Sequence, residues 1–315
     1  MTGSARSVLR WLVRRIALSA LVLLGSATTA FLALRLTPGD PVRVILGGST
    51  ATPEVMAQVR HELGTDRPLS EQYFLFIGRL LRGDLGTSYQ LRDTVSHVIG
   101  SQLWQTAELA LASFALAFVV ALLLAVSTAG RWPVLRGIST QVELVLSASP
   151  GFWVGVLLLT LFSFRWHVFP AAGGDGFSGL VLPAVTLAAS MVGVFAQVMR
   201  AGVERALEEP FVLSARARGS GETAVRFRHA LRHAMVPMVT LSGWVVGTLF
   251  SGAVVVETVF SRQGLGRVLA TAIQGRDFPV VTGVVVVSTL VFVVVNLLVD
   301  WLYRVIDPRL REVPA

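Results

Sequence analysis

A charged stretch of 37 residues decides how this sequence folds. It runs from Arg200 to Val236, between two apolar runs, and reads RAGVERALEEPFVLSARARGSGETAVRFRHALRHAMV. Pro210 can open a short helix, because its missing N–H costs nothing at the first helical position. Gly219 can close that helix in the left-handed conformation, and Ser220 can cap a second one. The stretch therefore predicts two short helices at a sharp corner, forming a knob that can enter a socket on another protein.

The second predicted helix is amphipathic at a period of 3.6 residues. His229 and His233 are four residues apart and could share a metal ion. No acidic residue or third histidine has the spacing to complete such a site, so a surface helical face is the favoured interpretation. The predicted apolar face holds Ala224, Phe227, Leu231, Ala234 and Met235, and the polar side holds Arg226, Arg228, His229, Arg232 and His233.

The composition indicates a membrane protein. The chain has 315 residues, of which 53% are hydrophobic, and a mean hydropathy of +0.68. These values are typical of a polytopic membrane protein rather than a soluble domain. The net charge of +8 comes from arginines in loops beside apolar runs, which favours membrane topology over nucleic-acid binding.

Cysteine and lysine are missing from the chain, and each absence excludes certain kinds of functional site. The chain has no cysteine, which excludes disulfides and thiolate metal sites. All 27 basic residues are arginine. Without lysine the chain cannot form a Walker A loop or a lysine Schiff base. If ATP drives this protein, a partner must hydrolyse it.

Six apolar runs are long enough to cross a bilayer. Six crossings place both termini on one side of the membrane. On that side, 16 arginines fall in 73 residues, against 11 in 107 on the other side, so we expect the termini inside. The runs are 16–34, 104–128, 138–164, 181–199, 237–256 and 279–303.

These runs divide the chain into regions. We expect a cytoplasmic N-terminus with the first transmembrane helix over 1–34, an extracytoplasmic region over 35–103, a five-helix core over 104–303 and a cytoplasmic tail over 304–315. Short helices are expected at 53–63 and 70–82 in the outer region. The core includes the charged loop 200–236 and an outer loop, 257–278. That outer loop is too short and polar to cross, and suits a segment that dips into the outer mouth.

Two other kinds of site have some support in the sequence. The run Gly176-Phe177-Ser178-Gly179 has the look of an intramembrane serine nucleophile, but such a site needs a base within reach and every histidine falls in a predicted loop. A glycine-rich turn is favoured. Intramembrane carboxylates are often functional. For Glu108, Glu143 and Asp300, however, a structural role is favoured over substrate binding because they lie towards helix ends.

Several groups of residues together resemble one family. In the charged loop they are Phe211-Val212, Ala215-Arg216-Ala217-Arg218-Gly219, His229-Ala230-Leu231-Arg232 and Pro237. Elsewhere they are Arg35 to Pro41, Asp66 to Leu69, Gln72-Tyr73, Gly83 to Tyr89, Glu257 to Gly266, Asn296, Asp300 and Asp307-Pro308-Arg309. The sequence resembles permeases of ABC importers, specifically the dipeptide/oligopeptide/nickel family. It departs from the general loop pattern, which begins Glu-Ala-Ala, because Leu213 and Ser214 stand at the first two of those positions.

The resemblance implies an all-α permease with six transmembrane helices and the type I ABC-importer fold, in a bacterial inner membrane. It implies a sister permease subunit, two ATPase subunits that use ATP and Mg, and an extracytoplasmic binding protein. It implies a di- or oligopeptide substrate, with nickel or another small ligand as the alternative. No catalytic residue, metal, cofactor or nucleic-acid partner is expected for this chain. A secondary transporter or channel is a further alternative, but it would need coupling-ion sites near the midplane and commonly internal repeats, and the sequence has no repeat and few midplane charges.

The resemblance also implies two sets of site residues. The set expected to couple to the ATPase is Phe211, Ala215, Arg216, Ala217, Arg218, Gly219, His229 and Leu231. The set expected at the external gate or binding-protein contact is Glu257, Phe260, Gln263, Gly264, Leu265 and Gly266.

Overall fold

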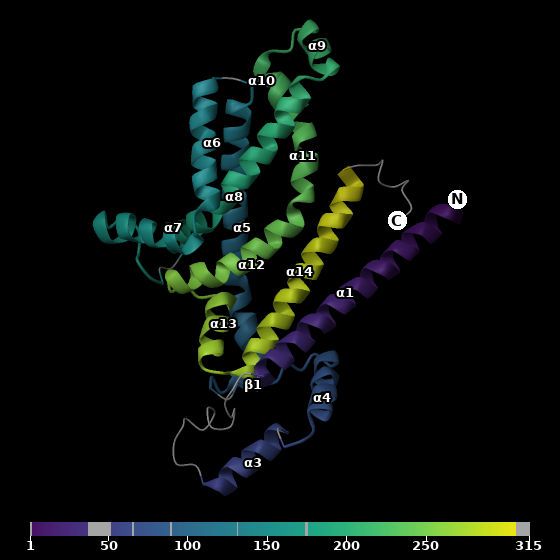
Figure 1. The fold of residues 1–315 in the computed structure, drawn as a ribbon, viewed down its shortest axis with the longest axis vertical. Coiled ribbons are helices and arrows are strands. Elements are labelled where there is room, and N and C mark those ends of the chain that lie inside the picture. Colours follow the sequence, from purple (N-terminus) through teal and green to yellow (C-terminus); the bar gives the residue numbers. More distant parts are fainter. Residues whose placement is uncertain are drawn as a thin grey trace. The chain divides into compact units, whose positions relative to one another are not determined.

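The computed structural model describes residues 2–36, 52–64, 66–88, 90–130, 132–173 and 176–306 (Figure 1). The quoted Thr37 to Pro41, Tyr89 and Asp307 to Arg309 lie outside these ranges. In chain order the elements are α1 (Thr2–Leu36), α3 (Pro53–Leu63), α4 (Leu69–Leu81), β1 (Thr87–Ser88), β2 (Asp93–Thr94), α5 (Val95–Thr128), α6 (Pro133–Ala148), α7 (Gly151–Leu158), the π-helix η1 (Leu159–Arg165), α8 (Gly176–Leu207), α9 (Pro210–Ala217), α10 (Glu222–Ala224), the π-helix η2 (Val225–Ala230), α11 (Leu231–Thr240), α12 (Ser242–Val259), α13 (Leu265–Gln274) and α14 (Phe278–Ile306).

The chain forms two compact units. The first comprises Met1–Trp104, Val268–Val295 and Ile306–Ala315, and the second comprises Gln105–Arg267 and Asn296–Val305. The two short helices expected in the outer region are present as α3 and α4 of the first unit.

Polar and aromatic contacts hold the first unit together. The hydroxyl groups of Ser26 in α1 and Thr289 in α14 hydrogen-bond at 2.7 Å, and those of Thr28 and Tyr73 at 2.8 Å. The Phe31 ring packs edge-on against Tyr73. The strands β1 and β2 pair antiparallel. These bonds join helices far apart in sequence.

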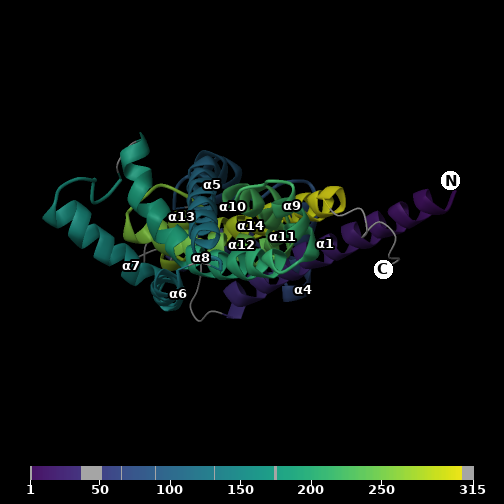
Figure 2. The ribbon, with the colours of Figure 1, turned by 90° about the horizontal axis from the view of Figure 1, so that it is seen from above.

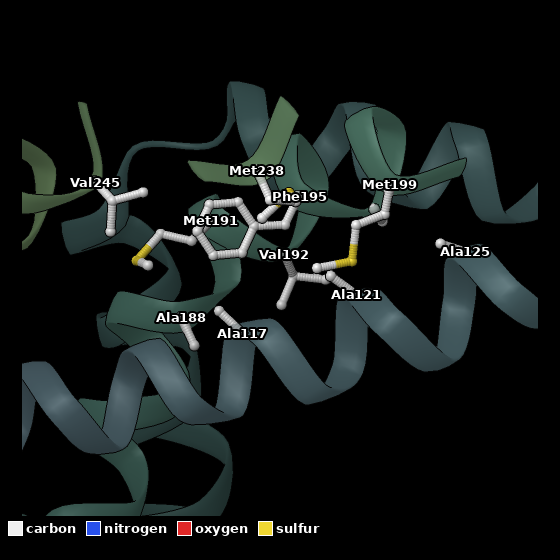
Figure 3. Close-up of a cluster of buried hydrophobic side chains, with 11 residues drawn as sticks. Ala117, Ala121, Ala125, Ala188, Met191, Val192, Phe195, Met199, Met238 and Val245 are labelled. Carbon is white, nitrogen blue, oxygen red and sulfur yellow. The ribbon is translucent and has the colours of Figure 1, made fainter. Parts of the chain in front are cut away.

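The second unit is built around α8, which packs against α6, α7, α11, α12 and η2. The face of α5 that carries Ala117, Ala121 and Ala125 lies against large side chains of α8, including Phe195 (Figure 3). Small residues four apart allow helices in a membrane to approach closely. Gly202 likewise allows α8 to approach α11 closely, because a Cβ at this position would lie 2.7 Å from the Cα of Ala234 in α11.

The third apolar run is not one straight helix, as 138–164 was expected to be. α6 and the helix that follows it, Gly151–Arg165, are bent by 105° (Figures 1 and 2). The cause is Pro150, which has no N–H to donate and disfavours helical backbone at the residue before it. Ser149 is extended, with φ −75° and ψ 133°. The run is therefore a broken span or a re-entrant segment.

The number of crossings follows from helix length and composition. Within the described ranges, four helices are long and apolar enough to cross a membrane, or five if the bent pair is one span. The segment Trp244–Val259 is apolar but shorter. The count of six stays a prediction.

Candidate functional site

The knob, defined here as residues 208–224, contains α9, which begins and ends as the sequence predicts. Pro210 occupies the first turn of α9, and Gly219 has φ +82°. The Gly219 N–H donates to the Arg216 carbonyl at 2.9 Å, and the Ser220 N–H to the Ala215 carbonyl at 3.1 Å. This pair of bonds is the Schellman arrangement, which needs a left-handed residue and so favours glycine.

The second half of the knob differs from the prediction in its N-terminal cap. The N-cap residue of α10 is Gly221, where Ser220 was expected, and no side chain caps this end. The corner is instead closed by an ion pair between Arg216 and Glu222, with Nε and Oε1 2.8 Å apart. Figure 1 shows α9 and α10 together beyond one end of α8.

The knob has a buried side and an exposed side. Val212 and Ala215 pack against Val225 and are buried. Ala215, which the resemblance placed in the set expected to couple to the ATPase, therefore faces inward, away from the exposed side of the knob. The large apolar side chain on the outside is Leu213, which is 69% exposed. Arg216, Ala217, Arg218 and Gly219 are also exposed, and Phe211 is half-buried with its ring stacked on His233.

The predicted apolar face of the second helix is wrong in its first turns. Phe227 is 47% exposed, while Val225 and Arg226 are buried. The reason is the π-helix η2, whose hydrogen bonds span five residues in place of four and so shift the inward-facing positions along the sequence. Residues further on, such as Ala234, face inward as predicted. His229 and Leu231 are half-buried.

A buried ion pair that the sequence did not reveal joins α8 to α6. Arg200 of α8 donates from Nη1 to Oε2 of Glu143 in α6 at 3.0 Å, and both side chains are almost fully buried. The same guanidinium donates to the hydroxyl groups of Thr128, at 2.8 Å, Thr140 and Ser139, both at 3.0 Å. A charge inside an apolar run needs a partner, and Glu143 was the one signal of this network.

The outer-loop residues meet at a second buried carboxylate. Glu257 lies in the last turns of α12, not in a loop as expected, and is fully buried. It accepts hydrogen bonds from the hydroxyl of Thr106 at 2.6 Å and from the N–H groups of Gly266 and Arg267 at 2.7 and 3.1 Å. The Leu265 N–H donates to Thr106 at 2.8 Å. Glu257 thus satisfies the free N–H groups at the start of α13 and places a negative charge at its positive end.

Two glycines make room for this carboxylate. A Cβ on Gly264 would overlap the carboxyl group of Glu257, and one on Gly266 would lie 2.8 Å from the backbone N of Val254 and 2.9 Å from Glu257 Oε2. Phe260, Gly264, Leu265 and Gly266 are buried in this corner, whereas Gln263 is exposed on it. The sequence predicted these residues as one group, and the structure brings most of them into one packed corner.

Two family models match the chain. Residues 117–312 match the binding-protein-dependent transport system inner membrane component, and residues 8–110 match the N-terminal part of such membrane components. The chain belongs to this family. The predicted family and the all-α permease fold are confirmed.

Relatives cover nearly the whole permease. It is 38% identical over 288 residues to the glutathione transport system permease protein GsiC of Salmonella typhimurium, covering 90% of this chain and 93% of the relative. The GsiC protein of Escherichia coli strain K12 is 36% identical over 284 residues, with coverages of 89% and 92%. A crystal structure of an amino acid ABC transporter matches with a TM-score of 0.52 and 16% identity, over 66% of this chain and 94% of that one, which shows the shared fold.

These findings fix the class of the protein. It is the permease subunit of an ABC importer, a multi-pass protein of the inner membrane. It is a transport component and not an enzyme. Its family implies partner ATPase subunits and a substrate-binding protein.

Proposed function

We propose that this permease carries small peptides, glutathione among them, across the inner membrane. The observation that supports this most is the 38% identity, over 90% of the chain, to permeases named for glutathione transport. The resemblance of the charged loop to the peptide branch of the family supports the same substrate class.

The knob is the element we assign to docking of the ATPase. A permease without lysine cannot form a P-loop, so ATP and Mg are used by two partner ATPase subunits. Coupling then requires a rigid element whose position differs between two states. The knob is rigid because its Schellman turn fixes it and because Val212 and Ala215 pack on Val225 of η2. Leu213 on its outer side offers an apolar anchor for a socket.

The complete importer in this proposal is a heteromer. A sister permease completes the pathway, and an extracytoplasmic binding protein delivers the peptide. The termini and the knob face the cytoplasm, as the arginine bias favours. The corner held by Glu257 faces outward, where the exposed Gln263 can contact the binding protein or help to gate the outer mouth.

The substrate assignment is tested by uptake. The complete complex is reconstituted in proteoliposomes with its binding protein, and uptake is measured for radiolabelled glutathione, dipeptides, longer peptides and Ni²⁺. We expect ATP-dependent uptake of glutathione or dipeptides, and unlabelled peptide should reduce this uptake by competition. Uptake of Ni²⁺ alone, with no peptide transported, would refute the peptide assignment.

The docking assignment is tested by Leu213→Asp. The exposed position predicts a change in folding stability within about 0.5 kcal/mol. A charge in an apolar socket should nevertheless weaken ATPase binding by ~2 kcal/mol or more, about 30-fold, the range of an interface hot spot. The matched control is Arg218→Ala on the same exposed side, where an exposed charge contributes only ~0–1 kcal/mol. Equal ATPase affinity in the two variants would show that Leu213 is not the anchor.

A further inference from the structure

Arg226 makes a contact that docking of the ATPase does not explain. Its side chain is almost fully buried, although its sequence position predicts the polar side of the helix. Its Nη1 donates to the carbonyl oxygen of Val126 at 3.1 Å and to that of Ala129. Val126 is in the last turn of α5 and Ala129 directly follows that helix. An α-helix leaves the carbonyls of its last turn without intrahelical donors, and Arg226 supplies donors from another element.

The charge of Arg226 suits this position. The C-terminus of a helix carries a partial negative charge, which a nearby cation stabilises. The last turn of α5 contains no basic residue of its own. Arg226 in η2 therefore provides both the hydrogen bonds and the cation that this helix end lacks.

The π-helix η2 is what brings Arg226 to that place. Its wider turn lets two consecutive residues, Val225 and Arg226, face inward together. Val225 packs on Val212 and Ala215 of α9, while Arg226 reaches the end of α5. One turn of η2 thus contacts the knob on one side and α5 on the other. Single π turns inside α-helices occur frequently at functional sites.

The surrounding packing leaves little room for independent movement. Ala129 at the end of α5 is buried in a cluster with Val203 and Ala206 of α8 and with Ala230 and Ala234 of the helix that follows the knob. At Gly202 the backbone of α8 lies so close to Ala234 that a Cβ would overlap it. Close-packed interiors of this kind transmit displacement because they compress little.

We propose that Arg226 is a positioning residue that holds the knob and the end of α5 as one rigid body. A displacement of the knob by an ATPase subunit then enters the membrane through α5. This inference rests on the proposed role of the knob in docking, and it adds the route by which the movement continues.

The direct test measures a distance in the working complex. Because the chain has no cysteine, single cysteines can be placed without removing any. Ser127 on α5 and Ala217 on α9 are both exposed and accept spin labels. In the complex with its ATPases, the distance between the two labels should be the same without nucleotide and with trapped ATP. A shift between those states in the otherwise native protein would overturn the proposal.

Variants of Arg226 separate positioning from simple stabilisation. Arg226→Met should lower the number of substrate molecules transported per ATP hydrolysed by about fivefold or more, the lower end of coupling between sites. The label distance should then differ between the two states. Arg226→Lys, whose ammonium group can still donate to the carbonyls, should keep most of the ratio. Arg228→Met, an exposed position on η2, is the matched control and should leave it unchanged.

The outcomes also separate this inference from the proposed function. If Arg226→Met keeps the native ratio, Arg226 only stabilises the fold and the proposal is wrong. If Arg226→Met does not fold, two measurements still test the proposal: the label distance in the otherwise native protein, which should not change between the two states, and the transport ratio of Arg226→Lys, which should stay close to native. If Leu213→Asp uncouples the complex while the labels shift, docking at the knob stands and only the route through α5 fails.

Discussion

Removing the positive partner of the buried ion pair between α8 and α6 should destabilise the permease severely. In Arg200→Met the carboxylate of Glu143 stays fully buried and loses its cation. Breaking a buried pair in this way costs about 3–5 kcal/mol, because the remaining charge is uncompensated. The double variant Arg200→Met with Glu143→Leu removes both charges. The hydroxyls of Thr128 and Thr140 keep carbonyl acceptors in their own helices.

The double variant should therefore recover much of the loss. Ser139 loses the partners it has in this network, at a cost of about 1–3 kcal/mol for a buried hydroxyl. Replacing the buried ion pair by apolar side chains offsets part of the cost of the Ser139 hydroxyl. We expect the double variant within about 2 kcal/mol of the native permease, so the two substitutions should be strongly non-additive.

The matched control lies on the same two helices. Arg136 of α6 and Glu204 of α8 also pair, at 3.1 Å, but the arginine side chain is half exposed. Arg136→Met should cost no more than about 1 kcal/mol. The assay is denaturant unfolding of the purified permease in lipid nanodiscs, for each single variant and the double. Two results would refute the reasoning. One is an equal loss of unfolding free energy in Arg200→Met and Arg136→Met. The other is a double variant whose loss equals the sum of the losses in Arg200→Met and Glu143→Leu.

Three further predictions concern the outer corner and the topology. Gly264→Ala should lower the free energy of unfolding by ~1–3 kcal/mol, because its Cβ displaces the buried Glu257 carboxylate and its hydrogen bonds break. In the same denaturant-unfolding assay Gly247→Ala, where a Cβ meets nothing, should be neutral or slightly stabilising, and equal losses for Gly264→Ala and Gly247→Ala would contradict the account. A photo-crosslinker at the exposed Gln263 should capture the binding protein, and crosslinks to lipid only would count against that contact. A reporter fused after residue 60 should lie outside and one after Gly221 inside, so finding both on one side would reject the six-crossing topology.

Features set by a single residue were predictable from the sequence. Pro210 and Gly219 delimit α9 because their backbone restrictions act locally, whatever surrounds them. Glu257 with Gly264 and Gly266 was recognisable as a group. Its actual role, a carboxylate that holds the start of α13, needed the fold, because Thr106 is distant in sequence.

Features set by packing were not predictable. The π turn at Val225–Ala230 has no sequence signal, and it moved Arg226 from the predicted polar face into a buried contact. Arg200 also gave no sign of its partner, because Glu143 lies on another helix. The bend at Pro150 is an exception among the features set by a single residue: its cause is local, but the prediction of this span used hydropathy, and both halves of the bent pair are apolar.

The central claim, that the knob passes the ATPase cycle to the permease, is tested most directly by hydrolysis in the complete complex. Gly219 has φ +82°, and a Cβ there meets nothing within the chain. Gly219→Ala therefore adds only backbone strain of about 1–2 kcal/mol, while Gly219→Trp adds the same strain and a large side chain on the exposed face. At matched expression, substrate-stimulated ATPase activity and transport should be largely kept in Gly219→Ala and lost in Gly219→Trp. Native stimulation and transport in the Gly219→Trp complex would show that the knob is not the transmission element.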